Sequence, residues 1–104
     1  MSSRINLQNE LETLLGCAVY FDPPESIKIS YPCVIYSLDR LVPLRADNKL
    51  YQVHPRYHVM CCSKDPDNTM ALEIMNHFQH VTFENRQTHD HIHMDNLTLY
   101  YWKE

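Results

Sequence analysis

The chain is poor in glycine and has no long apolar segment. A single glycine in 104 residues excludes glycine-rich loops that hold dinucleotides or nucleoside triphosphates, because such loops need several glycines. No run of about 18 apolar residues is present, so we expect no transmembrane helix. The first fifteen residues carry Glu10 and Glu12 and lack a continuous apolar run, which is not typical of a secretory signal. We therefore expect the chain to fold in a cytoplasm.

Positive charge is also scarce. Nine Lys and Arg residues stand against thirteen Asp and Glu residues, a formal net charge of −4. This balance argues against a large electrostatic footprint on nucleic acid, although an acidic wall could let DNA slide past without binding it.

The four cysteines are Cys17, Cys33, Cys61 and Cys62. In a cytoplasm we expect four reduced, mostly buried thiols, and the adjacent pair should point to opposite faces of a strand.

The length and composition predict one ordinary globular domain over residues 1–104. A chain of this length can bury one modest core. The apolar fraction of 44% and the charged fraction of 21% are typical of such domains.

Two segments have the pattern of amphipathic helices. Leucines recur at helical spacing within residues 3–15, and Gly16 follows where a helix C-cap favours glycine. A second apolar stripe ends near His77, and Asp65 followed by Pro66 predicts the start of that helix.

The remaining periodicity predicts strands and loops. Residues 51–63 alternate strictly between an apolar face with Tyr57 and Val59 and a mixed face. The predicted strands cover residues 17–21, 32–39, 51–63, 81–84 and 97–102. Between them we expect a long connection over 40–50 and a polar loop over 85–95. Pro55 weakens the ladder and favours an edge or a protruding arm.

These elements predict an α+β fold. The strands are joined mostly by hairpin-length links, which favours a largely antiparallel sheet of four to five strands. Two helices should pack on one face of this sheet, and a long β-hairpin should protrude from it.

The sharpest local pattern is a histidine repeat. His89, His91 and His93 would place three imidazoles on one side of a strand, a weak candidate site for Zn²⁺ or Fe²⁺. The stronger interpretation is a solvated polar loop, because a catalytic centre would also need a nearby acid and a walled pocket. We therefore predict no cofactor and no enzymatic activity.

Two other chemical patterns are weaker. Cys61 or Cys62 near His58 could form a thiol nucleophile, but no oxyanion donor or orienting group is evident. Asp65, Asp67 and Glu73 could form a carboxylate cluster, but helix capping explains the two aspartates better.

Two regions are candidate interfaces with a partner. Basic and apolar residues mix in the connection over 40–50, which suits either a solvated loop or an arm that docks on a neighbouring subunit. Aromatic residues at the end of the chain leave apolar surface on the second face of a small sheet. The candidate residues are Arg40, Leu41, Leu44, Arg45, Asp47, Lys49, Tyr100 and Trp102.

Four segments, taken in order, resemble those of small bacteriophage proteins at the head–tail junction. They are YPCVIYSLD at 31–39, ADNKLY at 46–51, RYHVMCCSKDPD at 56–67 and DNLTLYY at 95–101. The chain thus resembles the tail terminator, or tail-to-head joining, proteins of lambda-like, long-tailed phages. The histidine-rich segment 89–93 departs from that pattern, since relatives tend to have other polar residues there.

The resemblance implies a structural protein of the virion rather than an enzyme. Its subunits would form a homo-oligomer, commonly a hexameric ring with head-to-tail contacts that close by rotation. The ring would cap the tail tube protein and offer its other face to a head-completion or neck protein, with DNA passing through the lumen without specific binding. No membrane partner is implied. Another neck or tail-completion protein, a small histidine-based metal-binding protein or enzyme, and a regulatory protein that binds through Tyr100 and Trp102 are the alternatives.

Overall fold

The computed structural model describes residues 3–46 and 49–101. The element order is α-β-β-β-α-β-β, as predicted from the sequence. The elements are α1 (Ser3–Leu15), β1 (Ala18–Phe21), β2 (Cys33–Ala46), β3 (Lys49–Ser63), α2 (Met70–His77), β4 (Val81–His89) and β5 (Ile92–Tyr100). Within the described ranges, no helix is long and apolar enough to cross a membrane.

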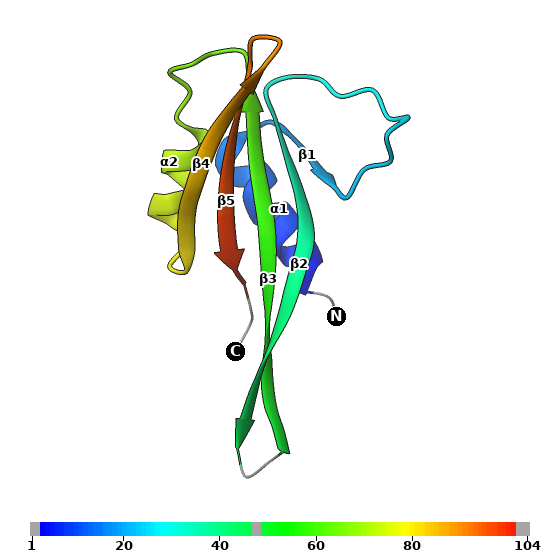
Figure 1. The fold of residues 1–104 in the computed structure, drawn as a ribbon, viewed down its shortest axis with the longest axis vertical. Helices are drawn as coiled ribbons and strands as arrows, with labels where there is room; N and C mark the ends of the chain where they lie inside the picture. Colours follow the sequence, from blue (N-terminus) through cyan, green and yellow to red (C-terminus); the bar gives the residue numbers. More distant parts are fainter. Residues whose placement is uncertain (1–2, 47–48, 102–104) are drawn as a thin grey trace.

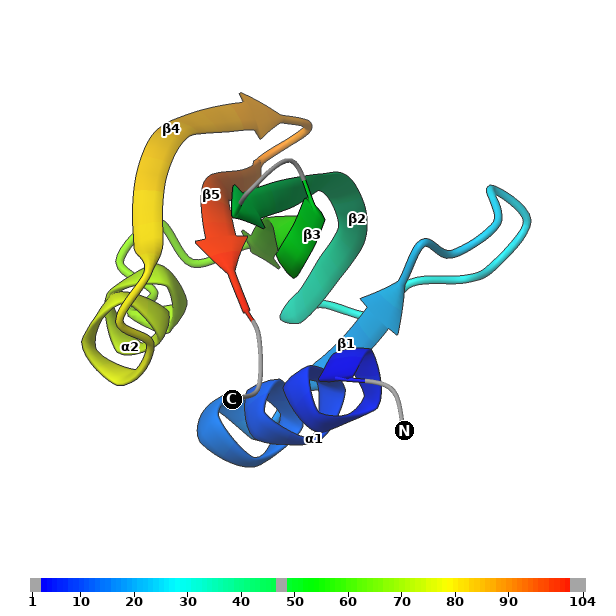
Figure 2. The same ribbon diagram turned by 90° about the horizontal axis from the view of Figure 1, so that it is seen from below.

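The five strands form one sheet in the order β1-β2-β3-β5-β4 (Figure 1). Every neighbouring pair is antiparallel except β1 and β2, which run parallel. Both helices lie on the same side of this strongly curved sheet (Figure 2). The predicted α+β class, with a mostly antiparallel sheet, two helices on one face and a protruding hairpin, is confirmed.

The core lies between the helices and this face of the sheet. Leu7 and Leu11 of α1 and Ile74 of α2 are fully buried there. The predicted alternation of β3 is confirmed over its second half, where Tyr57, Val59 and Cys61 point into this core. The sheet contributes Val34, Tyr36, Tyr57, Val59, Cys61, Leu97 and Leu99. The opposite face of the sheet, which the helices do not cover, is called the outer face below.

The predicted connection over residues 40–50 is wrong, because most of it is strand. β2 continues to Ala46 and β3 begins at Lys49, and the two pair along their whole length. The ladder contains irregularities between Leu38 and Arg40 and between Leu44 and Arg45. Alternation of apolar and polar residues is weak here, since no core lies on either side, so periodicity alone missed these strands.

Two further predicted boundaries are wrong. The polar segment 85–95 is not a loop, because β4 and β5 form a hairpin that turns at Asp90 and His91. Both turn residues have positive φ, of 51° and 64°. α2 begins at Met70 rather than near Asp65, whose side-chain Oδ1 instead accepts a hydrogen bond from the Asp67 backbone N–H at 2.9 Å. Asp65 thus shapes a local turn before the helix.

Two local features behave as their chemistry requires. Gly16 follows α1 with φ of 61° and donates its N–H to the Glu12 carbonyl, as expected of a left-handed C-cap.

The Pro55 carbonyl accepts a hydrogen bond from the Tyr101 N–H at 3.1 Å, so the backbone of residue 55 faces the β5 side of its strand. Since proline has no N–H to donate there, the β3–β5 ladder stops at the preceding pair, Arg56 with Tyr100.

Candidate assembly surface

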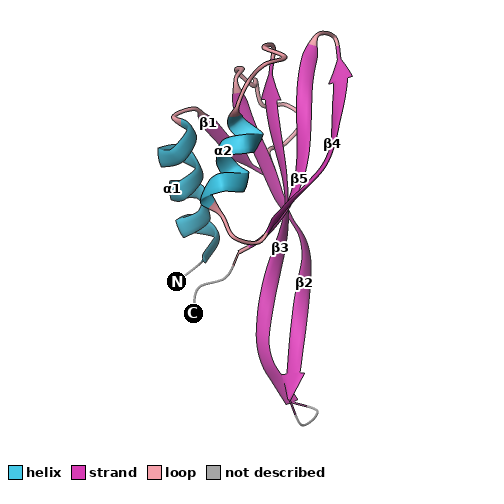
Figure 3. Cartoon of the chain, turned by 90° about the vertical axis from the view of Figure 1, so that its left-hand side faces the viewer, coloured by secondary structure: helices cyan, strands magenta, loops and turns pink. Residues whose placement is uncertain are grey.

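The outstanding surface feature is a two-stranded arm that extends beyond the rest of the sheet (Figures 1 and 3). We define the arm as residues 40–46 and 49–55. β5 pairs only with residues 56–63 of β3, and β1 pairs only with residues 33–36 of β2. Among residues 3–46 and 49–101, no third strand pairs with the arm and no helix covers it. A two-stranded ribbon by itself is marginally stable in water, which favours a partner surface.

The arm combines exposed apolar and basic side chains. Leu41 is 55% exposed on the arm, and Leu38 is 46% exposed at its root. Arg40, Arg45 and Lys49 are also exposed. Residues 39–56 hold four basic and two acidic side chains, whereas the rest of the chain holds five basic and eleven acidic ones. The arm is thus a positive projection on an acidic domain, and this polarity favours contact with a second acidic surface.

The root of the arm is held by an ion pair. Arg56 Nε lies 2.7 Å from Asp39 Oδ2, which joins β3 to β2 where the arm leaves the body. The body is the rest of the described chain, with the core, both helices and the other strands. Hydrogen bonds with Tyr100 and with Asp39 raise the pKa of Arg56. Tyr100, predicted as part of an exposed aromatic face, is half-buried at this root. Trp102, predicted with it, lies outside the described residues.

The other predicted interface residues fall along the arm. Arg40, Leu41, Leu44 and Arg45 are in β2, and Lys49 opens β3 opposite Ala46. Asp47 lies outside the described residues. The structure therefore gathers the predicted basic and apolar positions on the arm. Arg40 lies at its root, where Arg56 pairs with both Arg40 and Tyr100.

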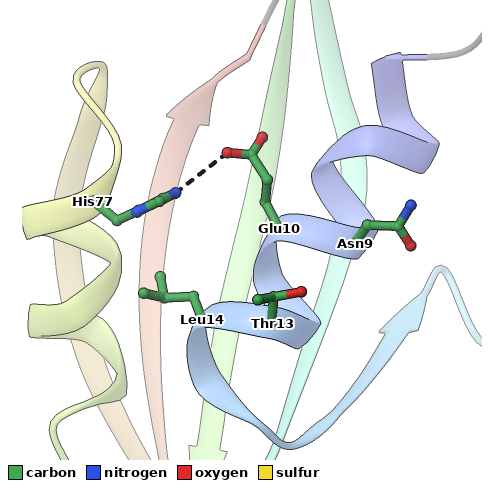
Figure 4. Close-up of a pocket in the computed structure, with 5 residues that line it drawn as sticks. All are labelled: Asn9, Glu10, Thr13, Leu14 and His77. Atoms are coloured by element: carbon green, nitrogen blue, oxygen red, sulfur yellow. Dashed lines mark hydrogen bonds and ion pairs between the residues drawn. The ribbon is translucent and has the colours of Figure 1, made fainter.

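A second surface feature is a groove between α1 and α2 (Figure 4). It has a volume of about 480 Å³ and is lined by Asn9, Glu10, Thr13, Leu14 and His77. His77 Nε2 lies 3.2 Å from Glu10 Oε1 across the groove. No local pattern in the sequence indicates this groove, because its two ionisable residues are 67 positions apart and share no motif.

Glu10 also anchors the end of the sheet. The Tyr101 hydroxyl donates a hydrogen bond to Glu10 Oε2. Burial, followed by this bond to a carboxylate, raises the pKa of Tyr101 to about 12. Glu10 therefore joins α1 to α2 and to the residue after β5, and both of its oxygens have partners within the domain.

The histidine repeat does not converge. His89 ends β4 and His91 lies in the turn, whereas His93 pairs with Thr88 and its Nδ1 lies 3.1 Å from the Thr88 hydroxyl. The His89 side chain is 81% exposed. Over residues 3–46 and 49–101, no group of three or more His, Cys, Asp or Glu side chains is placed to hold a metal ion. The turn breaks the alternation that would have put the three rings on one side.

The same hairpin carries a partly buried ion pair that no motif in the sequence indicates. Asp95 is 2% exposed, and Arg86 binds both of its oxygens, at 2.5 and 3.0 Å. Arg86 Nη1 also donates to the Pro66 carbonyl at 2.8 Å. One guanidinium thus fastens the β4–β5 hairpin to the segment that precedes α2. The cross-strand register of Arg86 and Asp95 creates this contact, and register cannot be read from either strand alone.

On the outer face, a polar chain crosses three strands. His58 Nε2 lies 2.9 Å from Asn96 Oδ1, and Asn96 Nδ2 donates to Asn85 Oδ1 at 2.8 Å. Asn96 is 8% exposed. His58 is therefore engaged with the Asn96 amide on the outer face.

Comparisons of the chain with models of known protein families, with curated proteins and with solved structures gave no match.

Proposed function

We propose that this chain is a structural protein of a long-tailed bacteriophage, a tail terminator subunit that assembles into a ring, commonly a hexamer. The ring would cap the tail tube and join it to the head-completion or neck protein, and it would act without covalent chemistry. Its place would be the head–tail junction of the virion, after synthesis in the cytoplasm of a bacterial host. The ordered resemblance of four segments supports this proposal.

The arm is the observation that carries the proposal. In the part of the chain that the structure describes, no third strand pairs with it. It exposes Leu41 and concentrates positive charge on an otherwise acidic chain. The arm tip and the turn between β4 and β5 lie at opposite ends of the molecule (Figure 1). A projection at one end that fits a different surface of the next copy gives the head-to-tail contacts from which rings are built.

The acidic remainder of the chain supports the same role. The eleven acidic residues outside residues 39–56 can attract the arm of a neighbouring copy. Where they faced a lumen, they would repel DNA phosphates, so that DNA passes without binding.

The test is the solution mass of the purified chain, measured by light scattering behind a sizing column. We expect a species of about six times the chain mass of 12.4 kDa. The double charge reversal R45E/K49E should give a smaller species, because it removes the positive charge of the arm. Its urea unfolding midpoint should match the wild type, since both residues are exposed.

A charge reversal away from the arm is the matched control. Lys28 is exposed in the segment between β1 and β2, so K28E should assemble like the wild type. A wild-type monomer at every concentration, also with tail tubes present, would contradict the proposal. Equal assembly of R45E/K49E and wild type would show that the positive charge of the arm does not form the subunit contacts.

A further inference from the structure

Two cysteines face each other across the outer face of the sheet. Cys33 begins β2 and is paired in register with Cys62, near the end of β3. Their neighbours Val34 and Cys61 point into the core, so this pair points to the other face. Paired Cα atoms in antiparallel strands lie about 4.5–5.5 Å apart. Disulfides span Cα separations of about 4.4–6.8 Å, so this register meets the requirement.

The two thiols are chemically unequal. A hydrogen bond between them raises the pKa of Cys33 and lowers the pKa of Cys62. Cys33 therefore keeps its proton and donates it, and Cys62 sulfur is the better nucleophile. Cys61, which precedes Cys62 in the chain, differs from it, because burial raises the pKa of the Cys61 thiol.

A small cavity lies beside the chain segments that carry the pair. It has a volume of about 210 Å³ and is lined by Tyr31, Pro32, Ser63, Lys64 and Asp65. Pro32 and Ser63 are the chain neighbours of Cys33 and Cys62, and Tyr31 interacts electrostatically with both thiols. The cysteines themselves are 0% and 2% exposed. The cavity thus has room for a reagent of the size of a few waters, each about 30 Å³, and is too small for a tripeptide disulfide.

We propose that Cys33 and Cys62 form a peroxide-reactive dithiol that closes to an intramolecular disulfide. The Cys62 thiolate attacks one oxygen of hydrogen peroxide, the O–O bond breaks, and hydroxide leaves and is protonated to water. The Cys33 sulfur then attacks the sulfenic sulfur of Cys62, and its proton leaves with the hydroxyl group as a second water. Two thiols are oxidised to one disulfide, and one peroxide is reduced to two waters.

The disulfide would tie the first residue of β2 to β3, at the end of the ladder opposite the arm (Figure 1). It would form when a chain folded in reducing surroundings meets peroxide outside them. This inference does not depend on ring assembly.

The experiment treats the reduced full-length chain with stoichiometric hydrogen peroxide and counts thiols after unfolding. We expect four thiols to fall to two, and tandem mass spectrometry should place the link between Cys33 and Cys62. The C17S and C61S variants should still lose two thiols each. The C33S variant should form no internal link and should accumulate a sulfenic acid on Cys62, trapped with dimedone.

Three results would overturn the inference. They are four remaining thiols, a link between any other pair, and separate oxidation of the cysteines without a link. Mass-spectrometric location of the disulfide in the oxidised wild-type chain distinguishes these results even where a variant does not fold. Oxidised glutathione under the same conditions should leave four thiols, and equally fast reaction with it would refute entry through the cavity.

Discussion

At the scale of single residues, the fold depends on a few polar side chains that join distant segments. Arg86 and Asp95 fasten the β4–β5 hairpin to the segment before α2. Glu10 joins α1 to His77 and to Tyr101. Each of these side chains has its partner within the domain, which indicates a structural role for both clusters.

Removing Arg86 should destabilise the domain. The R86A variant leaves the 2% exposed Asp95 without its cation. Loss of one partner of a fully buried pair costs about 3–5 kcal/mol, and we expect a smaller loss here because the Arg86 side chain is 34% exposed. Urea unfolding followed by circular dichroism measures this change. The double variant R86A/D95A should recover part of the loss, because no uncompensated buried charge remains. A double variant as unstable as the sum of the two single variants would contradict this account.

The stability of the domain should fall at alkaline pH through Tyr101. Its pKa is about 12 in the folded chain, above the ordinary value of 10.0. The unfolded state therefore loses this proton first, so the contribution is fully present below pH 10.0 and is lost as the pH rises toward 12. Urea unfolding of wild type and Y101F at several pH values checks this. Their stability difference should shrink across that window, and a constant difference would be inconsistent with it.

At the scale of elements, the body and the arm have separate roles. Among the described residues, the buried core contains no residue between Tyr36 and Tyr57. The body therefore does not need the arm to bury its apolar surface. The arm, in turn, is a continuation of β2 and β3 whose direction is set by the body.

A trimmed arm should leave folding intact and abolish assembly. Deleting residues 42–46 and 49–54 would keep Asp47 and Asn48 as a short turn between Leu41 and Pro55, which are already paired. The urea midpoint should stay near that of the wild type, because no core residue is lost. Light scattering should report a monomer. A ring from the trimmed chain would show that the contacts lie elsewhere, and an unfolded trimmed chain would show that the arm supports the body.

The spacing of apolar residues along the chain predicted some of these elements and not others. The helices and the core alternation of β3 followed from periodicity, because burial on one face leaves a regular apolar spacing. The arm strands and the far part of the β4–β5 hairpin did not. The arm contributes no described residue to the core and β4 is mostly exposed, so neither needs such spacing. The predicted basic and apolar interface positions were brought together on the arm, whereas the histidine repeat was divided by a turn.

At the scale of the whole molecule, the shape is elongated. The principal extents are 50 × 27 × 24 Å and the radius of gyration is 14.7 Å, against about 13 Å for a compact domain of this length. The arm accounts for the difference (Figure 3). An isolated chain with this shape exposes an unpaired ribbon to solvent, and the proposed ring would give that ribbon a partner surface.

The sequence by itself determined the fold class, the order of the elements, the core-facing positions of β3 and the glycine cap of α1. Each depends on residues near one another in the chain, so spacing and residue type suffice. Only the tertiary structure decided the length of the arm, the groove at Glu10 and His77, the Arg86–Asp95 pair and the opposition of Cys33 to Cys62. These depend on strand register and helix packing, which distant segments set together through burial and hydrogen bonding.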